Sequence, residues 1–144
     1  MSKKKLIIVS GYFNPLHSGH IEYFELSKLH GDLLLVIINN DHQRELKGSK
    51  FFMNQKEREL IVSKLNMVDF TFLSIDSEKS VVESLRYIFN KYSHKYDLIF
   101  TNGGDQNAID SPEKNVCLEL SIKFLDGMGK KIQSSSWLLK NVND

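Results

Sequence analysis

Residues 6–24 read LIIVSGYFNPLHSGHIEYF: an apolar run, a loop with two histidines, and then an amphipathic segment. The apolarity of residues 6–9 is continuous rather than alternating, which is typical of a strand buried on both faces. Gly11 permits a backbone conformation or a close approach that a side chain would block, and Pro15 stiffens the loop. The stretch therefore predicts a buried strand, a tight loop and a helix in succession.

The rest of the chain repeats this alternation of strand and helix. Apolar runs at 33–41, 70–74 and 98–104 each end in small or polar residues. Alternating strands and helices predict an α/β fold: a doubly wound, Rossmann-like, mainly parallel five-stranded sheet with helices on both faces. The expected helices are 20–30, 54–65, 80–92, 112–120 with Ser111 as N-cap and Pro112 at the first position, and a short final helix from Ser134; the expected fifth strand is 122–125.

Four polar or glycine-rich loops follow the expected strands, namely SGYFN, NNDH, TNGGDQN and DGMGKK. In open α/β sheets, ligands bind in the crevice beyond the carboxyl ends of the strands. The sequence therefore predicts that these loops form one ligand site.

Composition narrows the class of protein. The 144 residues fit one domain spanning 1–144, and a net charge of +1 argues against a dedicated nucleic-acid surface. The single cysteine, Cys117, excludes an internal disulfide framework, which favours a cytoplasmic location. The apolar run after the lysines at 3–5 is far shorter than the ~20 residues of a membrane span, so no membrane association is expected.

His17 and His20 stand three residues apart at the expected start of a helix. Free backbone N–H groups, the positive end of the helix dipole and two imidazoles together favour an anion, most naturally a phosphate chain. Two alternatives stay open at this point. The histidines could ligate zinc, although no further ligands have recognisable spacing, or they could simply cap or pack the helix.

The stretch GYFNPLHSGH at 11–20 resembles the G-x-F-D-x-x-H-x-G-H motif of the cytidylyltransferase-like nucleotidyltransferases. This family includes glycerol-3-phosphate, choline-phosphate and ethanolamine-phosphate cytidylyltransferases and the heptose-phosphate adenylyltransferases. Four further motifs occur in the same order, so the resemblance covers nearly the whole chain. They are VIINND, LKGSKFFMNQKER, TNGGD and IQSSSWLL.

The resemblance implies transfer of a nucleotidyl group, with release of pyrophosphate from a nucleoside triphosphate. His17, His20 and Lys47 match the catalytic positions, where they would stabilise the transferring phosphate. Asp41, Lys50 and Arg58 would lie on the side of a small phosphorylated acceptor. The nucleotide-binding positions would be Gly11, Tyr12, Phe13, Gly19, Gly104, Asp105, Ser134, Ser135 and Ser136.

The same resemblance implies a metal ion and an oligomeric state. Mg²⁺ would accompany the triphosphate, held mainly by phosphate oxygens rather than by a protein metal site. A homodimer is expected because members of the family commonly form dimers. A non-catalytic sensor of CTP or ATP is the alternative from another class, although retention of His17, His20 and Lys47 together argues against it.

Several positions depart from the family pattern. Asn14 stands where aspartate is usual, and Ser49 stands where glycerol-3-phosphate enzymes have a second lysine, which Lys50 could replace. An arginine before the last motif is absent, and Lys130 and Lys131 lie nearby. KG followed by MNQKER resembles the choline-phosphate and ethanolamine-phosphate enzymes, so CTP is the expected donor. NGGD resembles the heptose-phosphate adenylyltransferases, which keeps ATP with a sugar phosphate as the alternative.

Overall fold

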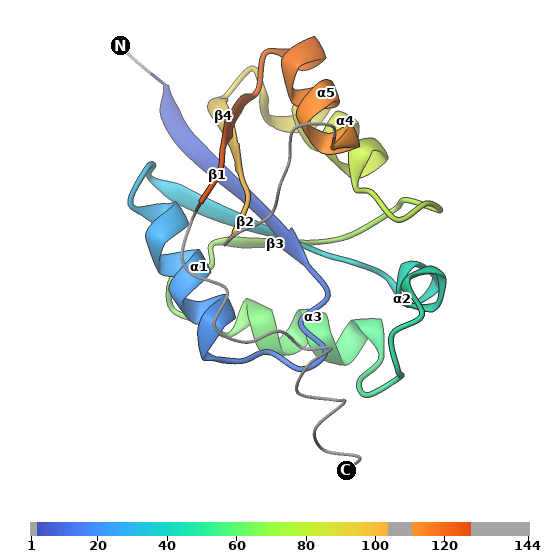
Figure 1. Ribbon diagram of the computed structural model, residues 1–144. Coiled ribbons are helices and arrows are strands. Elements are labelled where there is room, and N and C mark those ends of the chain that lie inside the picture. Colours follow the sequence, from blue (N-terminus) through green and yellow to red (C-terminus); the bar gives the residue numbers. More distant parts are fainter. Residues whose placement is uncertain (1–2, 104–110, 128–144) are drawn as a thin grey trace.

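The computed structural model describes residues 3–103 and 111–127 (Figure 1). Strands and helices alternate along the chain, except that two helices follow the second strand. The elements are β1 (Lys4–Gly11), α1 (Ser18–Lys28), β2 (Leu33–Ile38), α2 (Asp41–Lys47), α3 (Gln55–Ser63), β3 (Phe70–Leu73), α4 (Val82–Tyr92), β4 (Tyr96–Thr101), α5 (Pro112–Leu120) and β5 (Lys123–Leu125).

All five strands form one parallel sheet in the order β3-β2-β1-β4-β5. The central strand β1 pairs with β2 on one side and with β4 on the other. The direction of winding therefore reverses between β1 and β4, and a doubly wound sheet has its ligand crevice at this switch point. The predicted doubly wound fold is confirmed.

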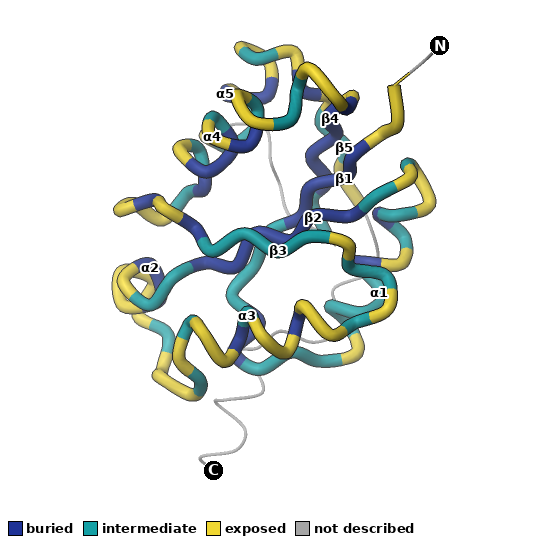
Figure 2. Tube along the Cα trace, turned by 180° about the vertical axis from the view of Figure 1, so that it is seen from behind, coloured by how far each residue is buried: buried dark blue, intermediate teal, exposed yellow. Residues whose placement is uncertain are grey.

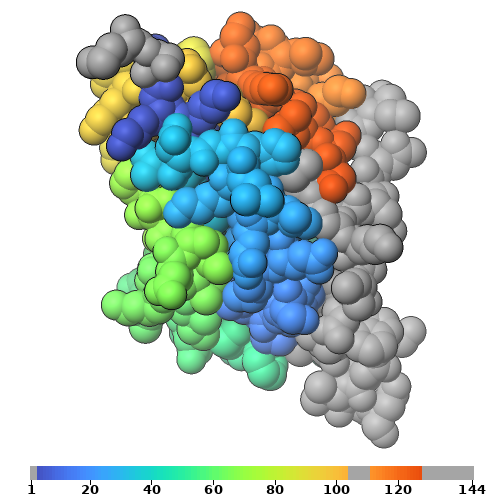
Figure 3. Space-filling model, turned by 90° about the vertical axis from the view of Figure 1, so that its left-hand side faces the viewer, coloured from blue at the N-terminus to red at the C-terminus, as the bar shows by residue number. Residues whose placement is uncertain are grey.

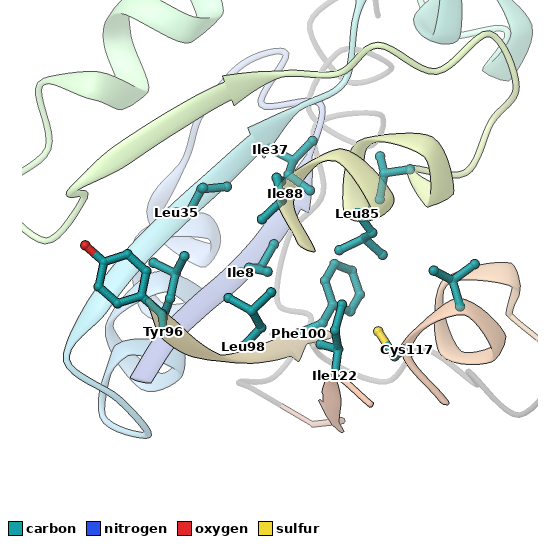
Figure 4. Close-up of a cluster of buried hydrophobic side chains, with 13 residues drawn as sticks. Ile8, Leu35, Ile37, Leu85, Ile88, Tyr96, Leu98, Phe100, Cys117 and Ile122 are labelled. Atoms are coloured by element: carbon teal, nitrogen blue, oxygen red, sulfur yellow. The ribbon is translucent and has the colours of Figure 1, made fainter. Parts of the chain in front are cut away.

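Helices cover both faces of the sheet, with α4 and α5 on one face and α1 and α3 on the other (Figure 1). Successive residues of β1 point to opposite faces, so Leu6 and Ile8 join the α4–α5 core while Ile7 and Val9 join the α1–α3 core. Figure 4 shows side chains of the first core meeting between the sheet and the helices. This double burial explains the continuous apolar runs of the sequence.

The buried residues of the sheet lie on its inner strands β1, β2 and β4, whereas no residue of the edge strands β3 and β5 is fully buried and each helix exposes its outer side (Figure 2). On the α1 face, the surface of α1 lies beside that of α3 and the turn after it (Figure 3). Lys28 joins the two by donating to the carbonyl of Met67 at 3.0 Å and pairing with Asp69 at 3.1 Å. These contacts fix the C-terminal end of α1 against the turn that precedes β3.

The helix α2 was not predicted, because residues 33–41 read as one strand running to Asp41. The strand instead ends at Ile38, and Asn40 caps α2 by accepting from the backbone N–H of Gln43 at 2.8 Å. The Gln43 side chain completes a reciprocal capping box, because its Oε1 atom accepts from the Asn40 N–H at 3.0 Å. Gly48 then ends the helix with φ 79, a left-handed conformation that suits glycine.

The predicted cap of α5 is confirmed, since Ser111 Oγ accepts from the Lys114 N–H at 3.1 Å and Pro112 takes the first helical position. The final helix expected from Ser134 lies outside the described residues, as does the loop at 104–110. Among the described residues, no helix has the length and apolarity needed to cross a membrane.

Candidate active site

The β1–α1 loop lies at the carboxyl end of the central strand. Phe13 adopts a positive φ of 53, and its ring is buried. A side chain at position 11 would meet that ring at 2.7 Å, which explains the glycine there. The Phe13 ring contacts His20 edge-on at a centroid distance of 4.9 Å. Gly11 therefore makes room for the Phe13 ring, which packs against His20. Because this ring is buried, only the backbone of Phe13 could contact a nucleotide.

His17 is the N-cap of α1, and His20 completes a reciprocal capping box. The Nδ1 atom of His17 accepts from the Gly19 N–H, and the Nδ1 atom of His20 accepts from the His17 N–H, both at 3.1 Å. The two rings stack with centroids 3.8 Å apart. Capping, one of the two alternatives from the sequence, is thus correct, and it leaves the second nitrogen of each ring available for another role.

The caps determine the protonation of both rings. Because each Nδ1 accepts a hydrogen bond, the proton of the neutral ring sits on Nε2, which becomes a donor. Burial lowers the pKa of His17, while burial together with the charges of His17 and Lys47 lowers the pKa of His20 to about 3. Both rings are therefore neutral Nε2–H donors near pH 7. His17 Nε2 is buried and has no hydrogen-bond partner among the described residues.

Lys47 lies at the last position of α2, rather than in a loop as predicted. Its ammonium nitrogen lies 4.5 Å from the centroid of the Tyr12 ring. The Tyr12 hydroxyl donates to the carbonyl of Gln43 at 3.4 Å, and burial raises the pKa of that hydroxyl. Tyr12 thus connects the β1–α1 loop with α2, and the fold brings Lys47 close enough to His20 to influence its charge.

Asp41 and Arg58, two of the predicted acceptor-binding residues, pair with each other at 2.8 Å. The Arg58 side chain is 0% exposed, and its guanidinium also donates to three backbone carbonyls. The acceptors are Met53, Tyr12 and Asn39. In this arrangement Arg58 joins the ends of β1 and β2 to the start of α3 and presents no surface to an acceptor.

Residues 48–53, which we call the acceptor loop after their predicted role, lie between α2 and Asn54, the N-cap of α3, and include the exposed Lys50. Phe51 and Phe52 are 62% and 52% exposed. Arg44 contacts this loop twice. Its guanidinium donates to the carbonyl of Ser49 at 2.6 Å, and its Cζ atom lies over the Phe51 ring, 5.4 Å from the ring centroid. The acceptor loop therefore exposes a cation and two aromatic rings next to the β1–α1 loop, which it contacts through Asn14.

The end of β4 lies on the other side of β1 from the end of β2. The Tyr23 hydroxyl donates to the carbonyl of Thr101 at 2.6 Å, and the Ser27 and Thr101 hydroxyls bond at 2.8 Å. A side chain at Gly103 would meet the Tyr23 ring at 3.3 Å. These contacts fix the chain just before Gly104 and Asp105, which lie outside the described residues, as do Ser134, Ser135 and Ser136.

Within residues 3–103 and 111–127, no group of three histidine, cysteine or acidic side chains could hold a metal ion. The zinc alternative for the histidine pair thus finds no further ligand in this part of the chain. Two contributors to the candidate site, Arg44 and the amide of Asn14, could not be predicted from the sequence. The capping sequence N-x-x-Q at 40–43 would have revealed α2, but nothing local indicates where Arg44 points.

A helix N-terminus, two imidazole donors and a lysine converge where the winding of the sheet reverses, and this arrangement defines a phosphate-binding α/β domain. Residues 8–114 match the cytidylyltransferase-like family. The chain belongs to this family and is a nucleotidyltransferase.

Individual relatives agree with that assignment. An FAD synthase of Picrophilus torridus is 35% identical over 81% of this chain and 77% of its own length. The bifunctional protein HldE of Aliarcobacter butzleri is 32% identical over 86% of this chain, which spans only 25% of that protein. The crystal structure of a lipopolysaccharide core biosynthesis protein from Thermoplasma volcanium has a TM-score of 0.69 at 26% identity, and the match covers 85% of this chain and 95% of that one.

Proposed function

We propose that this protein transfers AMP from ATP to a small phosphorylated acceptor and releases pyrophosphate. The observation that carries the proposal is the stacked pair of neutral histidines at the N-terminus of α1, beside Lys47. Their Nε2–H groups are donors without a charge of their own, and the buried Nε2 of His17 has no partner among the described residues. A buried donor of this kind costs about 1–3 kcal/mol if it is left unpaired, and a phosphate oxygen would satisfy it.

The reaction needs stabilisation of charge more than proton transfer. A phosphate oxygen of the acceptor attacks the α-phosphorus, and the bond from that phosphorus to the oxygen bridging toward the β-phosphate breaks. The electron pair leaves with pyrophosphate. The attacking phosphate is already ionised at pH 7, because its second pKa is about 6. No general base is required, and the barrier lies in bringing two anions together.

Three of the described residues could stabilise this charge. His17 and His20 would donate to the α-phosphate and to the bridging oxygen, while Lys47 would neutralise charge on the phosphate chain from the end of α2. Mg²⁺, when bound with the triphosphate, would neutralise the β- and γ-phosphates through their own oxygens. Gly104 and Asp105 remain predicted contacts of the nucleoside, and Ser134, Ser135 and Ser136 remain predicted contacts of the terminal phosphates.

ATP is a better supported donor than the CTP that the motifs first suggested. The FAD synthase of Picrophilus torridus matches this chain over 77% of its own length. FAD consists of FMN joined to AMP. Synthesis of FAD from FMN therefore consumes an adenine nucleotide. The resemblance of NGGD to the heptose-phosphate adenylyltransferases points to the same base.

The acceptor loop favours an acceptor with a flat ring. Phe51 and Phe52 expose more than half of their surface next to Lys50, so a planar ring could stack on an aromatic side chain while its phosphate meets a cation. FMN has both features, whereas a sugar phosphate has only the phosphate. We accordingly rank FMN before sugar phosphates. A homodimer remains a prediction, which light scattering of the purified protein would test.

The test is pyrophosphate release from ATP, CTP, GTP and UTP with Mg²⁺, each paired with FMN, heptose 1-phosphate, glycerol 3-phosphate and choline phosphate. We expect release with ATP, highest with FMN, and its loss in His17→Asn. Release only with CTP would refute the assignment of the donor. Binding of ATP without release for any acceptor would instead identify a nucleotide sensor.

A further inference from the structure

Asn14 links two loops that are distant in the sequence. Its side chain is buried, with the residue only 1% exposed. The Nδ2 group donates to the carbonyl of Lys50 at 2.8 Å, and Oδ1 accepts from the N–H of Met53 at 2.9 Å. One amide thus uses both a donor and an acceptor to hold the two ends of the segment that carries Phe51 and Phe52.

The two linked loops serve different halves of the proposed reaction. Asn14 lies three residues before His17, in the loop that would hold the transferring phosphate. Lys50 and Met53 belong to the acceptor loop, and Arg58 fixes the carbonyl of Met53 at 3.0 Å from the other side. Asn14 therefore sets the position of the acceptor loop relative to the histidines.

We propose that Asn14 is a positioning residue that aligns the acceptor with the transferring phosphate, and that its amide is required for this. The proposal rests on the proposed function. Aspartate, which is usual at this place in the family motif, could still accept from Met53. As a carboxylate it could not donate to Lys50, and it would place a buried negative charge against a carbonyl oxygen. We therefore expect aspartate at position 14 to impair the positioning of the acceptor loop in this chain.

The decisive variant is Asn14→Asp, with Asn54→Asp as its matched control. Asn54 caps α3 by accepting from the N–H of Glu57 at 2.8 Å, a role that aspartate fills equally well. In Asn14→Asp we expect the KM for the acceptor to rise about tenfold or more, because a buried hydrogen bond is lost. The Kd for ATP, measured by calorimetry, should change less than about twofold, because the histidines and Lys47 keep their own contacts.

Hydrogen exchange of the peptide covering residues 48–53 supplies a readout that does not depend on activity. We expect faster exchange in Asn14→Asp than in the wild type or in Asn54→Asp, with equal exchange in the β-strands. If Asn14→Asp fails to fold, Asn14→Ser replaces it, because its hydroxyl is neutral but too short to span both partners; the same two changes are expected.

The outcomes separate the two proposals. An unchanged acceptor KM together with unchanged exchange would overturn the role of Asn14, even if transfer of AMP is demonstrated. Faster exchange in a protein that transfers nothing to any acceptor would uphold the link between the loops and refute the proposed function. A rise in the Kd for ATP as large as the rise in the acceptor KM would show general damage, which also overturns the positioning role.

Discussion

The loops that follow β1 and β2 hold the residues of the two proposed halves of the site in contrasting ways. After β1, His17 and His20 are tied to backbone N–H groups through Nδ1, and their rings stack on each other. After β2, Lys50 and the neighbouring aromatic rings are exposed, and buried polar side chains fix the backbone beneath them. Groups that stabilise a transition state benefit from being fixed in advance, whereas groups that select an acceptor need an accessible surface.

Removing Arg58 should cause the largest effect and tests whether the acceptor loop depends on its buried support. Arg58→Met leaves three carbonyls and the Asp41 carboxylate without their donor, so we expect a loss of about 3–5 kcal/mol in the free energy of unfolding. Urea denaturation measures this loss. Arg86→Met is the control, because its partner Glu119 is solvent-exposed and the free energy should barely change. A stable Arg58→Met protein with a raised acceptor KM would instead support direct binding of substrate.

Substitution of His17 separates its capping role from its proposed catalytic role. His17→Asn keeps an oxygen that can accept from the Gly19 N–H but removes Nε2–H. We expect kcat to fall about 10²- to 10³-fold, as when one donor of an oxyanion site is lost, with the free energy of unfolding almost unchanged. His17→Ala should lose the same activity and also about 1 kcal/mol of stability. Full activity in His17→Asn would mean that this histidine only caps the helix.

A methyl group at position 11 tests the packing of the Phe13 ring against His20. Gly11→Ala forces the Phe13 ring to shift, because the new carbon would lie 2.7 Å from it. We expect a loss of about 1–3 kcal/mol in stability by thermal denaturation, as for other overpacked cores. Adding Phe13→Leu should recover part of this loss. Purely additive losses in the double variant would contradict a direct clash between the two side chains.

Tyr12 offers a smaller test of how Lys47 is held. Its ring faces the ammonium group, and a cation–π contact at an exposed position contributes about 0.5–1 kcal/mol. Tyr12→Phe keeps the ring and should keep kcat, whereas Tyr12→Leu should lower kcat about two- to fivefold. Steady-state kinetics of the two variants would distinguish them. Equal losses in both would assign the effect to the hydroxyl contact with Gln43.

The smallest expected change is in the protonation of the folded protein near neutral pH, where His20 should stay neutral. The pKa of His20 is about 3 in the folded protein and near 6.5 when unfolded, so unfolding takes up a proton between those values. Its contribution to stability is therefore complete above about pH 6.5 and declines as the pH falls toward 3. NMR titration should show no protonation of His20 between pH 5 and 8. A midpoint near 6.5 would contradict its burial as a neutral donor.

The sequence was sufficient for much of the fold and for the placement of the two histidines at the start of a helix, because both depend on local patterns. Continuous apolar runs marked the buried strands, and the double-histidine loop marked the start of α1. The proposed acceptor half depends on contacts between distant segments. Neither the burial of Arg58 among three carbonyls nor the link from Asn14 to Lys50 leaves a local pattern, so the sequence did not reveal either contact.

The most direct test of the account follows the α-phosphorus itself. ATP labelled at the α-phosphate is incubated with FMN, Mg²⁺ and the wild-type protein or His17→Asn, and the labelled products are separated. We predict that the label appears in FAD in an amount equal to the pyrophosphate released, and that both fall together by about 10²- to 10³-fold in the variant. Label that appears only in free AMP, or a variant that transfers as fast as the wild type, would contradict nucleotidyl transfer by the histidine pair.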